Sequence, residues 1–323
     1  MVVRVRRRTL LVGLAAGLTG ATATAGTALA TPSAAGILGS TRTSTLLPRA
    51  PIAYCPPAGT PPPVTGPVVR SDHVFGRAGR VLNTRVWRPT GRGPYPIVVF
   101  SHGLLSQPDD YAELLTGWAR AGFVVAAPLY PHTSLGAADF NTYDIVNQPA
   151  DASAVLTQLL DLRLGADPDR VVAAGHSAGG ITTVGLFSAH RDARLKAGVV
   201  FAGTDFLGTP FAGAPAAMLF VQGRLDRTVS WEAAHTVYRA VPWSRAMLTI
   251  TDGDHQSGTA ETGATTAFLR WSLYGGGPRL AAPAGATLTD ELHIPPVAGS
   301  SPARPTVWHS RRTSISCWPE NVL

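Results

Sequence analysis

The chain has 323 residues, of which 45% are hydrophobic and 15% charged, so it can bury the core of one large domain or of two ordinary ones. Its net charge of +7 comes mostly from arginines near the two ends, and the part between them is close to neutral. This distribution argues against a basic groove, and we expect no nucleic-acid partner.

Residues 1–30 have the pattern of an export signal. An arginine cluster precedes an apolar stretch that ends in Ala-Leu-Ala, and the pair Arg7-Arg8 resembles the twin-arginine signals that export folded proteins. We therefore predict cleavage near Ala30 and a secreted protein. Glycine and threonine interrupt the apolar stretch, so no integral membrane span is expected after cleavage.

Two further segments flank the central part of the chain. Residues 31–66 are rich in proline and predict a linker or a wrapped arm, whereas residues 276–323 lose all periodicity and predict a mobile tail. The two cysteines, Cys55 and Cys317, could pair in an oxidising compartment or remain separate thiols. Without clustered histidines they predict no metal site.

Residues 67–275 predict a single α/β domain. Two runs that flank the turn at residues 77–80 indicate an antiparallel hairpin. After it, short apolar runs alternate with helical patterns, from PIVVFSHG to ETGATTAFLRWSLYG. Apolar strands that are each followed by a helix indicate a mostly parallel, doubly wound sheet with helices on both faces.

The stretch Gly175-His176-Ser177-Ala178-Gly179 fits the pattern G-x-S-x-G between a strand and a helix. A strand that turns into a helix within one residue strains the serine backbone, and only glycine fits two positions to either side. This geometry exposes the hydroxyl group, so we predict that Ser177 is a nucleophile. The alternative is an ordinary glycine-rich strand end.

A serine nucleophile needs a base and a carboxylate that orients the base. His255 follows a predicted strand, in DGDHQSG, at the edge of the sheet where sites assemble. Asp226 follows the preceding strand, in GRLDRTV, and is the predicted acid, with Asp205 as the competing candidate.

Backbone N–H groups should bind the oxyanion that forms during acyl transfer. Those of Leu104, in the loop SHGLLS, and of Ala178 are the predicted donors, and we expect His102 to support this loop by hydrogen bonds. The connection after the run AGVVFAG is too short for a helical cap. The longer segment PHTSLGAADFNTYDIVNQPA could form a pocket wall but shows no amphipathic helix that could move as a lid. We therefore expect an open cleft without a large lid, with Tyr130 and Trp231 in its walls.

The motifs FSHGLLS, AAGHSAGG, VQGRLDRTV and DGDHQSG, in this order, resemble the α/β-hydrolase superfamily. Within it the chain is similar to secreted bacterial dienelactone-hydrolase-like esterases, akin to platelet-activating-factor acetylhydrolases and cutinases. Dienelactone hydrolase has cysteine in place of Ser177. Polyester-cleaving cutinases usually have methionine in place of Ala178 and an aromatic residue in place of Leu104.

Together these features predict a secreted serine carboxylic ester hydrolase that acts on short-to-medium acyl esters, needs no cofactor and is a monomer. An amide or peptide hydrolase with the same triad is an alternative, and so is an enzyme for polyesters or phospholipids. Outside enzymes, the alternative is a catalytically silent hydrolase fold that serves as a binding module. The sequence leaves the acyl chain and the alcohol of the substrate open.

Overall fold

The computed structural model describes residues 52–63, 66–276 and 280–291 of the chain. The predicted export signal, residues 1–30, lies outside the described residues, as does the segment 292–323. Cys317 falls in that segment, so its pairing with Cys55 stays a prediction, although Cys55 is not a free thiol.

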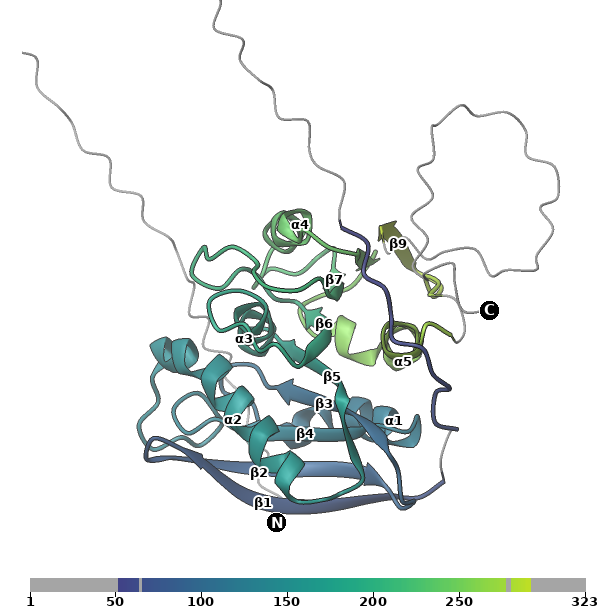
Figure 1. Cartoon of the computed structure of the whole chain (residues 1–323). Coiled ribbons are helices and arrows are strands. Elements are labelled where there is room, and N and C mark those ends of the chain that lie inside the picture. The colour runs from purple at the N-terminus through teal and green to yellow at the C-terminus, as the bar shows by residue number, and fades with distance from the viewer. Residues whose placement is uncertain (1–51, 64–65, 277–279, 292–323) are drawn as a thin grey trace, which may run out of the picture. The chain divides into compact units, whose positions relative to one another are not determined.

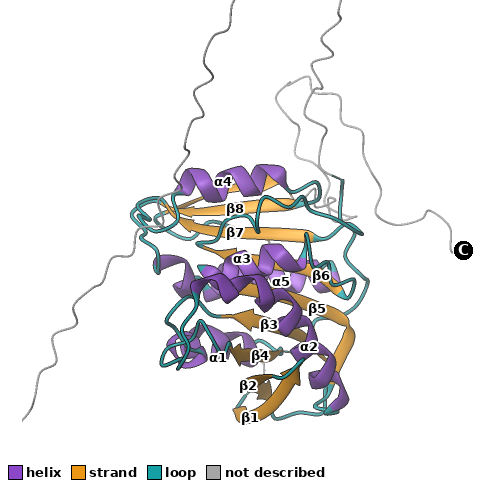
Figure 2. Cartoon of the chain, turned by 90° about the vertical axis from the view of Figure 1, so that its left-hand side faces the viewer, coloured by secondary structure: helices purple, strands orange, loops and turns teal. Residues whose placement is uncertain are grey.

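Nine strands form one sheet in the order β1-β2-β4-β3-β5-β6-β7-β8-β9. Figures 1 and 2 show this arrangement, and in Figure 2 the strand labels run from β8 down to β1. The strands are β1 (Val68–Arg77), β2 (Arg80–Pro89), β3 (Tyr95–Ser101), β4 (Val124–Leu129), β5 (Ala166–His176), β6 (Leu195–Phe201), β7 (Ala217–Gly223), β8 (Arg245–Ile250) and β9 (Ala286–Glu291).

The predicted hairpin and the predicted parallel sheet are both present. Strands β1 and β2 are antiparallel over their whole length, from Val68 opposite Pro89 to Arg77 opposite Arg80. Strand β2 then joins β4 in antiparallel fashion, and β4, β3, β5, β6, β7 and β8 follow in parallel. The predicted fold class is therefore confirmed.

Strand β9 differs from the expectation of a structureless tail. Residues 286–291 pair in antiparallel fashion with β8, from Ala286 opposite Ile250 to Glu291 opposite Arg245. The sequence ATLTDE has no continuous apolar run because an edge strand is covered on one side only. A criterion of continuous apolar runs therefore does not predict this strand.

Helices cover both faces of the sheet (Figure 1). Buried residues of α1 and α5 belong to one core cluster, and those of α2, α3 and α4 belong to a second cluster on the other face. The α-helices are α1 (Ala112–Arg120), α2 (Gln148–Asp161), α3 (Ala178–Leu186), α4 (Trp231–Ala240) and α5 (Thr262–Tyr274), and the 3₁₀ helices are η1 (Pro108–Tyr111), η2 (Thr142–Asn147) and η3 (Ser257–Ala260).

The described part of the proline-rich segment lies against this domain. Tyr54 is buried, its N–H donates to Ser244 Oγ at 2.8 Å, and its hydroxyl donates to the Ser272 carbonyl at 2.9 Å. Of the two readings of the segment, these contacts favour a wrapped arm.

Candidate active site

The strand β5 ends at His176, the helix α3 begins at Ala178, and Ser177 alone makes the turn between them. Its backbone has φ 57° and ψ −119°, a conformation that non-glycine residues rarely adopt and that costs stability. A Cβ atom at Gly175 would collide with the Gly179 carbonyl, and one at Gly179 would collide with the Ser101 carbonyl. The elbow therefore requires both glycines.

The surroundings of Ser177 suit a developing negative charge. Ser177 is half-buried, and α3 starts directly behind it, so unpaired N–H groups of the first turn face this point. Gly103, in the loop after β3, lies so close that a Cβ on it would be 3.3 Å from the Ser177 Cβ. Within the described ranges, the N–H groups of Leu104 and Ala178 donate to no other group, and both are available to an oxyanion.

Asp226 lies in the turn after β7 and is buried. Its Oδ1 accepts from the Thr228 N–H at 2.8 Å and the Val229 N–H at 3.0 Å. Its Oδ2 accepts from Gln222 Nε2 at 2.9 Å. Burial acts to raise the pKa of Asp226, but hydrogen bonds from His255 and from these N–H groups outweigh it and lower the pKa. The carboxylate is thus held ionised in a fixed position.

The predicted base and acid are paired. His255 Nδ1 lies 2.8 Å from Asp226 Oδ2, and because a carboxylate accepts hydrogen bonds, Nδ1 carries the proton and Nε2 is left free as a base. The competing candidate Asp205 is exposed and instead accepts from the Gly208 N–H at 2.6 Å. The geometry favours Asp226 over Asp205.

His176 connects the nucleophile elbow to the base. Its Nε2 donates to the His255 carbonyl at 2.8 Å, and the two imidazole rings lie 4.7 Å apart. No hydrogen bond joins Ser177 Oγ to His255 among the described residues. In free hydrolases this contact is often long, and it shortens when the substrate binds.

His102 supports the loop after β3 and links it to Tyr130, the residue that follows β4. His102 Nδ1 donates to the Gly103 carbonyl at 2.7 Å, and its Nε2 accepts from the Tyr130 N–H at 3.1 Å. His102 therefore props the loop, as the sequence predicts. Tyr130 does not wall a cleft, because its side chain is fully buried and its hydroxyl is bonded to Ser101 Oγ at 2.8 Å.

Tyr111, the last residue of η1, supports the same loop and links it to His176 at the end of β5. Its hydroxyl accepts from the Gly103 N–H at 3.1 Å and donates to His176 Nδ1 at 2.9 Å. Burial lowers the pKa of His176 to about 4, so this imidazole stays neutral and keeps both bonds. No sequence motif predicts a role for Tyr111 or for His176. The only available signal was the place of His176 directly before the nucleophile.

Trp231, the other predicted cleft wall, is the first residue of α4 and is half-buried. Its ring stacks on His235 with centroids 4.5 Å apart, Arg224 lies over its other side, and its Nε1 donates to Thr249 Oγ1 at 2.9 Å. These contacts fix the side chain at the carboxyl end of β7 and β8. None of them involves the predicted triad.

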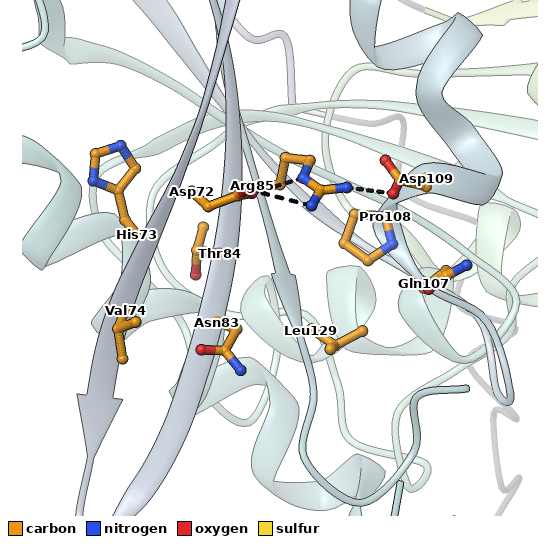
Figure 3. Close-up of a pocket in the computed structure, with 10 residues that line it drawn as sticks. All are labelled: Asp72, His73, Val74, Asn83, Thr84, Arg85, Gln107, Pro108, Asp109 and Leu129. Carbon is orange, nitrogen blue, oxygen red and sulfur yellow. Dashed lines mark hydrogen bonds and ion pairs between the residues drawn. The ribbon is translucent and has the colours of Figure 1, made fainter. Parts of the chain in front are cut away.

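Two surface hollows lie beside the site and contain none of the triad residues. The first has a volume of about 340 Å³ and lies between the β1–β2 hairpin and η1, where Arg85 bridges Asp72 and Asp109 (Figure 3). The second, of about 660 Å³, lies between α4 and the loop after β6. Because Arg85 is already paired with two carboxylates, it offers no free positive charge to a ligand in the first hollow.

The described ranges contain no candidate metal site and no candidate membrane span. No group of three or more His, Cys, Asp or Glu side chains there is arranged to hold a metal ion. Each helix of the same part of the chain is too short or too polar to cross a bilayer.

The central part of the chain is similar to one known protein family. Residues 78–209 match the sequence profile of the chlorophyllase family, which is a family of α/β hydrolases. The matched span includes the loop after β3 and Ser177 and ends before Asp226 and His255. No curated protein matches the chain. The sheet order and the family match together show an α/β-hydrolase-like fold.

Proposed function

We propose that this α/β hydrolase with a chlorophyllase-like central region is a serine esterase that hydrolyses short-to-medium acyl esters through an acyl-enzyme. The proposal rests on one observation. The strained Ser177, two unpaired N–H groups and the hydrogen-bonded His255–Asp226 pair come from four different loops and meet at the carboxyl edge of one sheet.

In the acylation step Ser177 Oγ attacks the carbonyl carbon of the ester, and His255 Nε2 takes the hydroxyl proton. The N–H groups of Leu104 and Ala178 bind the oxygen that becomes negative. When the tetrahedral intermediate collapses, the bond to the alcohol breaks and the alcohol leaves with the proton from His255. Asp226 keeps the imidazole oriented and stabilises its charged form.

Deacylation repeats the same steps with water. His255 takes a proton from the water molecule, whose oxygen attacks the acyl carbon, and the same two N–H groups bind the oxyanion. The bond to Ser177 then breaks, the serine oxygen recovers the proton, and the acid is released. These steps involve no redox change, and water is the second reactant.

A panel of p-nitrophenyl esters of rising acyl length tests this function and maps the acyl preference. A phospholipid, a polyester film and, because of the family name, chlorophyll are run beside it. We expect turnover of the short and medium esters and none by Ser177→Ala. A phosphonate ester should label Ser177 covalently, as detected by mass spectrometry. Cleavage of p-nitroanilides without cleavage of esters would favour an amide hydrolase.

The chlorophyllase match does not assign the chain to the dienelactone-hydrolase-like, acetylhydrolase-like or cutinase-like esterases. Membership of this group of secreted bacterial esterases is therefore part of the proposal. Export is likewise proposed, from the arginine cluster and apolar stretch of residues 1–30. Expression in a bacterial host, followed by N-terminal sequencing of the protein in the medium, tests it. A mature chain that begins shortly after Ala30 is expected, and a protein retained in the cell with an intact Met1 would contradict it.

A further inference from the structure

Large apolar side chains gather on the loops around the nucleophile. Seven of the twelve that are exposed in the described residues lie on loops at the carboxyl edge of the parallel strands, after β3, β4, β6 and β7. We call this set the apolar rim: Leu105, Leu135, Phe140, Tyr143, Val146, Leu207 and Leu225. Since ligands of open α/β sheets bind at this edge, a substrate must pass the apolar rim to reach Ser177.

Two leucines of the rim have a costly backbone conformation. Leu105 and Leu207 both have φ 53°, in the left-handed region that favours glycine and asparagine. Their side chains are 57% and 69% exposed, so they add little to the core. Strain of this kind destabilises a fold and clusters at functional sites. A role in binding explains why leucine stands at these two positions.

The rim is held in place by its loops. The Leu105 N–H donates to the Thr133 carbonyl at 2.8 Å, and the Leu135 N–H donates to the Ser106 carbonyl at 2.9 Å. These bonds join the loop after β3 to the loop after β4, so that Leu105 and Leu135 are presented together. The loop after β3 also carries the Leu104 N–H. A ligand that contacts Leu105 of the apolar rim therefore lies next to a predicted oxyanion donor.

We propose that the apolar rim docks this enzyme on an uncharged or zwitterionic lipid surface from which the ester enters the site, an inference that rests on the proposed esterase function. Seven side chains on four loops exceed what one ester chain can contact, whereas an extended surface reaches all of them. The same four loops expose four aspartates and two arginines: Asp109, Asp110, Asp139, Asp205, Arg224 and Arg227. Asp109 is paired with Arg85 and Arg224 with Glu232, so three of these carboxylates and one guanidinium remain. This excess of carboxylates disfavours anionic lipid.

Vesicle binding by the full chain carrying Ser177→Ala tests the docking without turnover of lipid. Co-sedimentation with phosphatidylcholine vesicles is compared for this parent and for Leu105→Asn and Leu207→Asn added to it. Asparagine tolerates a positive φ, so the melting temperature should stay equal or rise while the partition coefficient falls about tenfold for each leucine. The matched control is Leu162→Asn at the opposite edge of the sheet, where Leu162 is 37% exposed and where we expect no change.

The active proteins supply a second measurement. The rate with a long-chain p-nitrophenyl ester embedded in the vesicles is divided by the rate with dissolved p-nitrophenyl acetate, and this ratio should fall about tenfold in each rim variant. Equal partition and equal ratios in rim and control variants would overturn the docking surface, as would tighter binding to phosphatidylserine vesicles. Absence of turnover of both esters in the protein with Ser177 intact would instead refute the esterase, and the Ser177→Ala binding data would still decide the docking.

Discussion

Replacement of Tyr111 with phenylalanine removes one hydroxyl group from the buried support of the loop after β3. The ring remains, and its packing against Phe100, with centroids 4.8 Å apart, is kept. What is lost is the acceptor of the Gly103 N–H, at 3.1 Å, and the donor to His176 Nδ1, at 2.9 Å. The change therefore loosens the loop that carries the Leu104 N–H without altering any group that contacts the substrate.

Two effects of Tyr111→Phe can be estimated separately. Each buried polar group left without a partner costs about 1–3 kcal/mol, so two such groups should lower the free energy of unfolding by about 2–6 kcal/mol. Complete loss of one oxyanion donor costs about 10²–10³ in kcat. A loosened donor costs part of this, and we expect kcat to fall about tenfold to a hundredfold while KM changes little.

The matched control is Tyr54→Phe, which removes a buried hydroxyl that donates to the Ser272 carbonyl at 2.9 Å, away from the site. Steady-state kinetics with p-nitrophenyl butyrate and urea unfolding are measured for both variants. Tyr54→Phe should lose about 1 kcal/mol of stability and keep its kcat. If kcat falls equally in both variants, or if Tyr111→Phe keeps the parent kcat, the positioning role of Tyr111 is refuted.

Four further expectations concern the triad, the elbow, acid stability and access. Asp226→Asn should lower kcat by about 10⁴ and Asp205→Asn should not; a collapse of activity in Asp205→Asn alone would reassign the acid. Gly179→Ala should destabilise the fold by several kcal/mol, since its Cβ collides with the Ser101 carbonyl, and thermal unfolding near that of the parent would show that the elbow can relax. Burial lowers the pKa of His102 and of His176 to about 4, so between about pH 6.5 and pH 4 the unfolded chain binds protons that the folded chain does not. The free energy of unfolding should therefore decrease as the pH is lowered through this window, by up to about 3 kcal/mol for each histidine. A urea-unfolding profile that does not change over this pH range would contradict the expectation. Dissolved short esters should be hydrolysed with ordinary saturation kinetics because the loop after β6 is too short for a helical cap, whereas absence of turnover below the solubility limit would indicate a lid.

The catalytic edge could be predicted because its signals are local. A strand, a glycine, a serine, another glycine and a helix are read directly at residues 175–179. Position at the end of a predicted strand selects His255 and reduces the acid to Asp226 or Asp205, because parallel strands all end at one edge. The structure pairs these two side chains at 2.8 Å, a contact that sequence order suggests but does not measure.

The supports of the site were less predictable because they depend on side-chain direction and on distant packing. Tyr130 follows β4 just as a cleft residue would, yet its ring turns inward to Ser101. Tyr111 lies 65 positions from His176, and no periodic pattern connects the two. The aromatic side chain of Trp231 predicts a cleft wall. Its contacts with Arg224 and His235 depend instead on how α4 packs, which no local pattern shows.

Strand β9 also bears on where the enzymatic unit ends. Its six residues supply hydrogen-bond partners along the outer side of β8, and the first four residues of β8, Arg245 to Leu248, are buried. A fragment cut at residue 275, after α5, would leave this strand as an open edge with unpaired N–H and C=O groups and an apolar face. Such an edge is a template for pairing between molecules. We therefore expect the fragment that ends at residue 275 to aggregate, and a fragment that extends to residue 291 and keeps β9 not to aggregate.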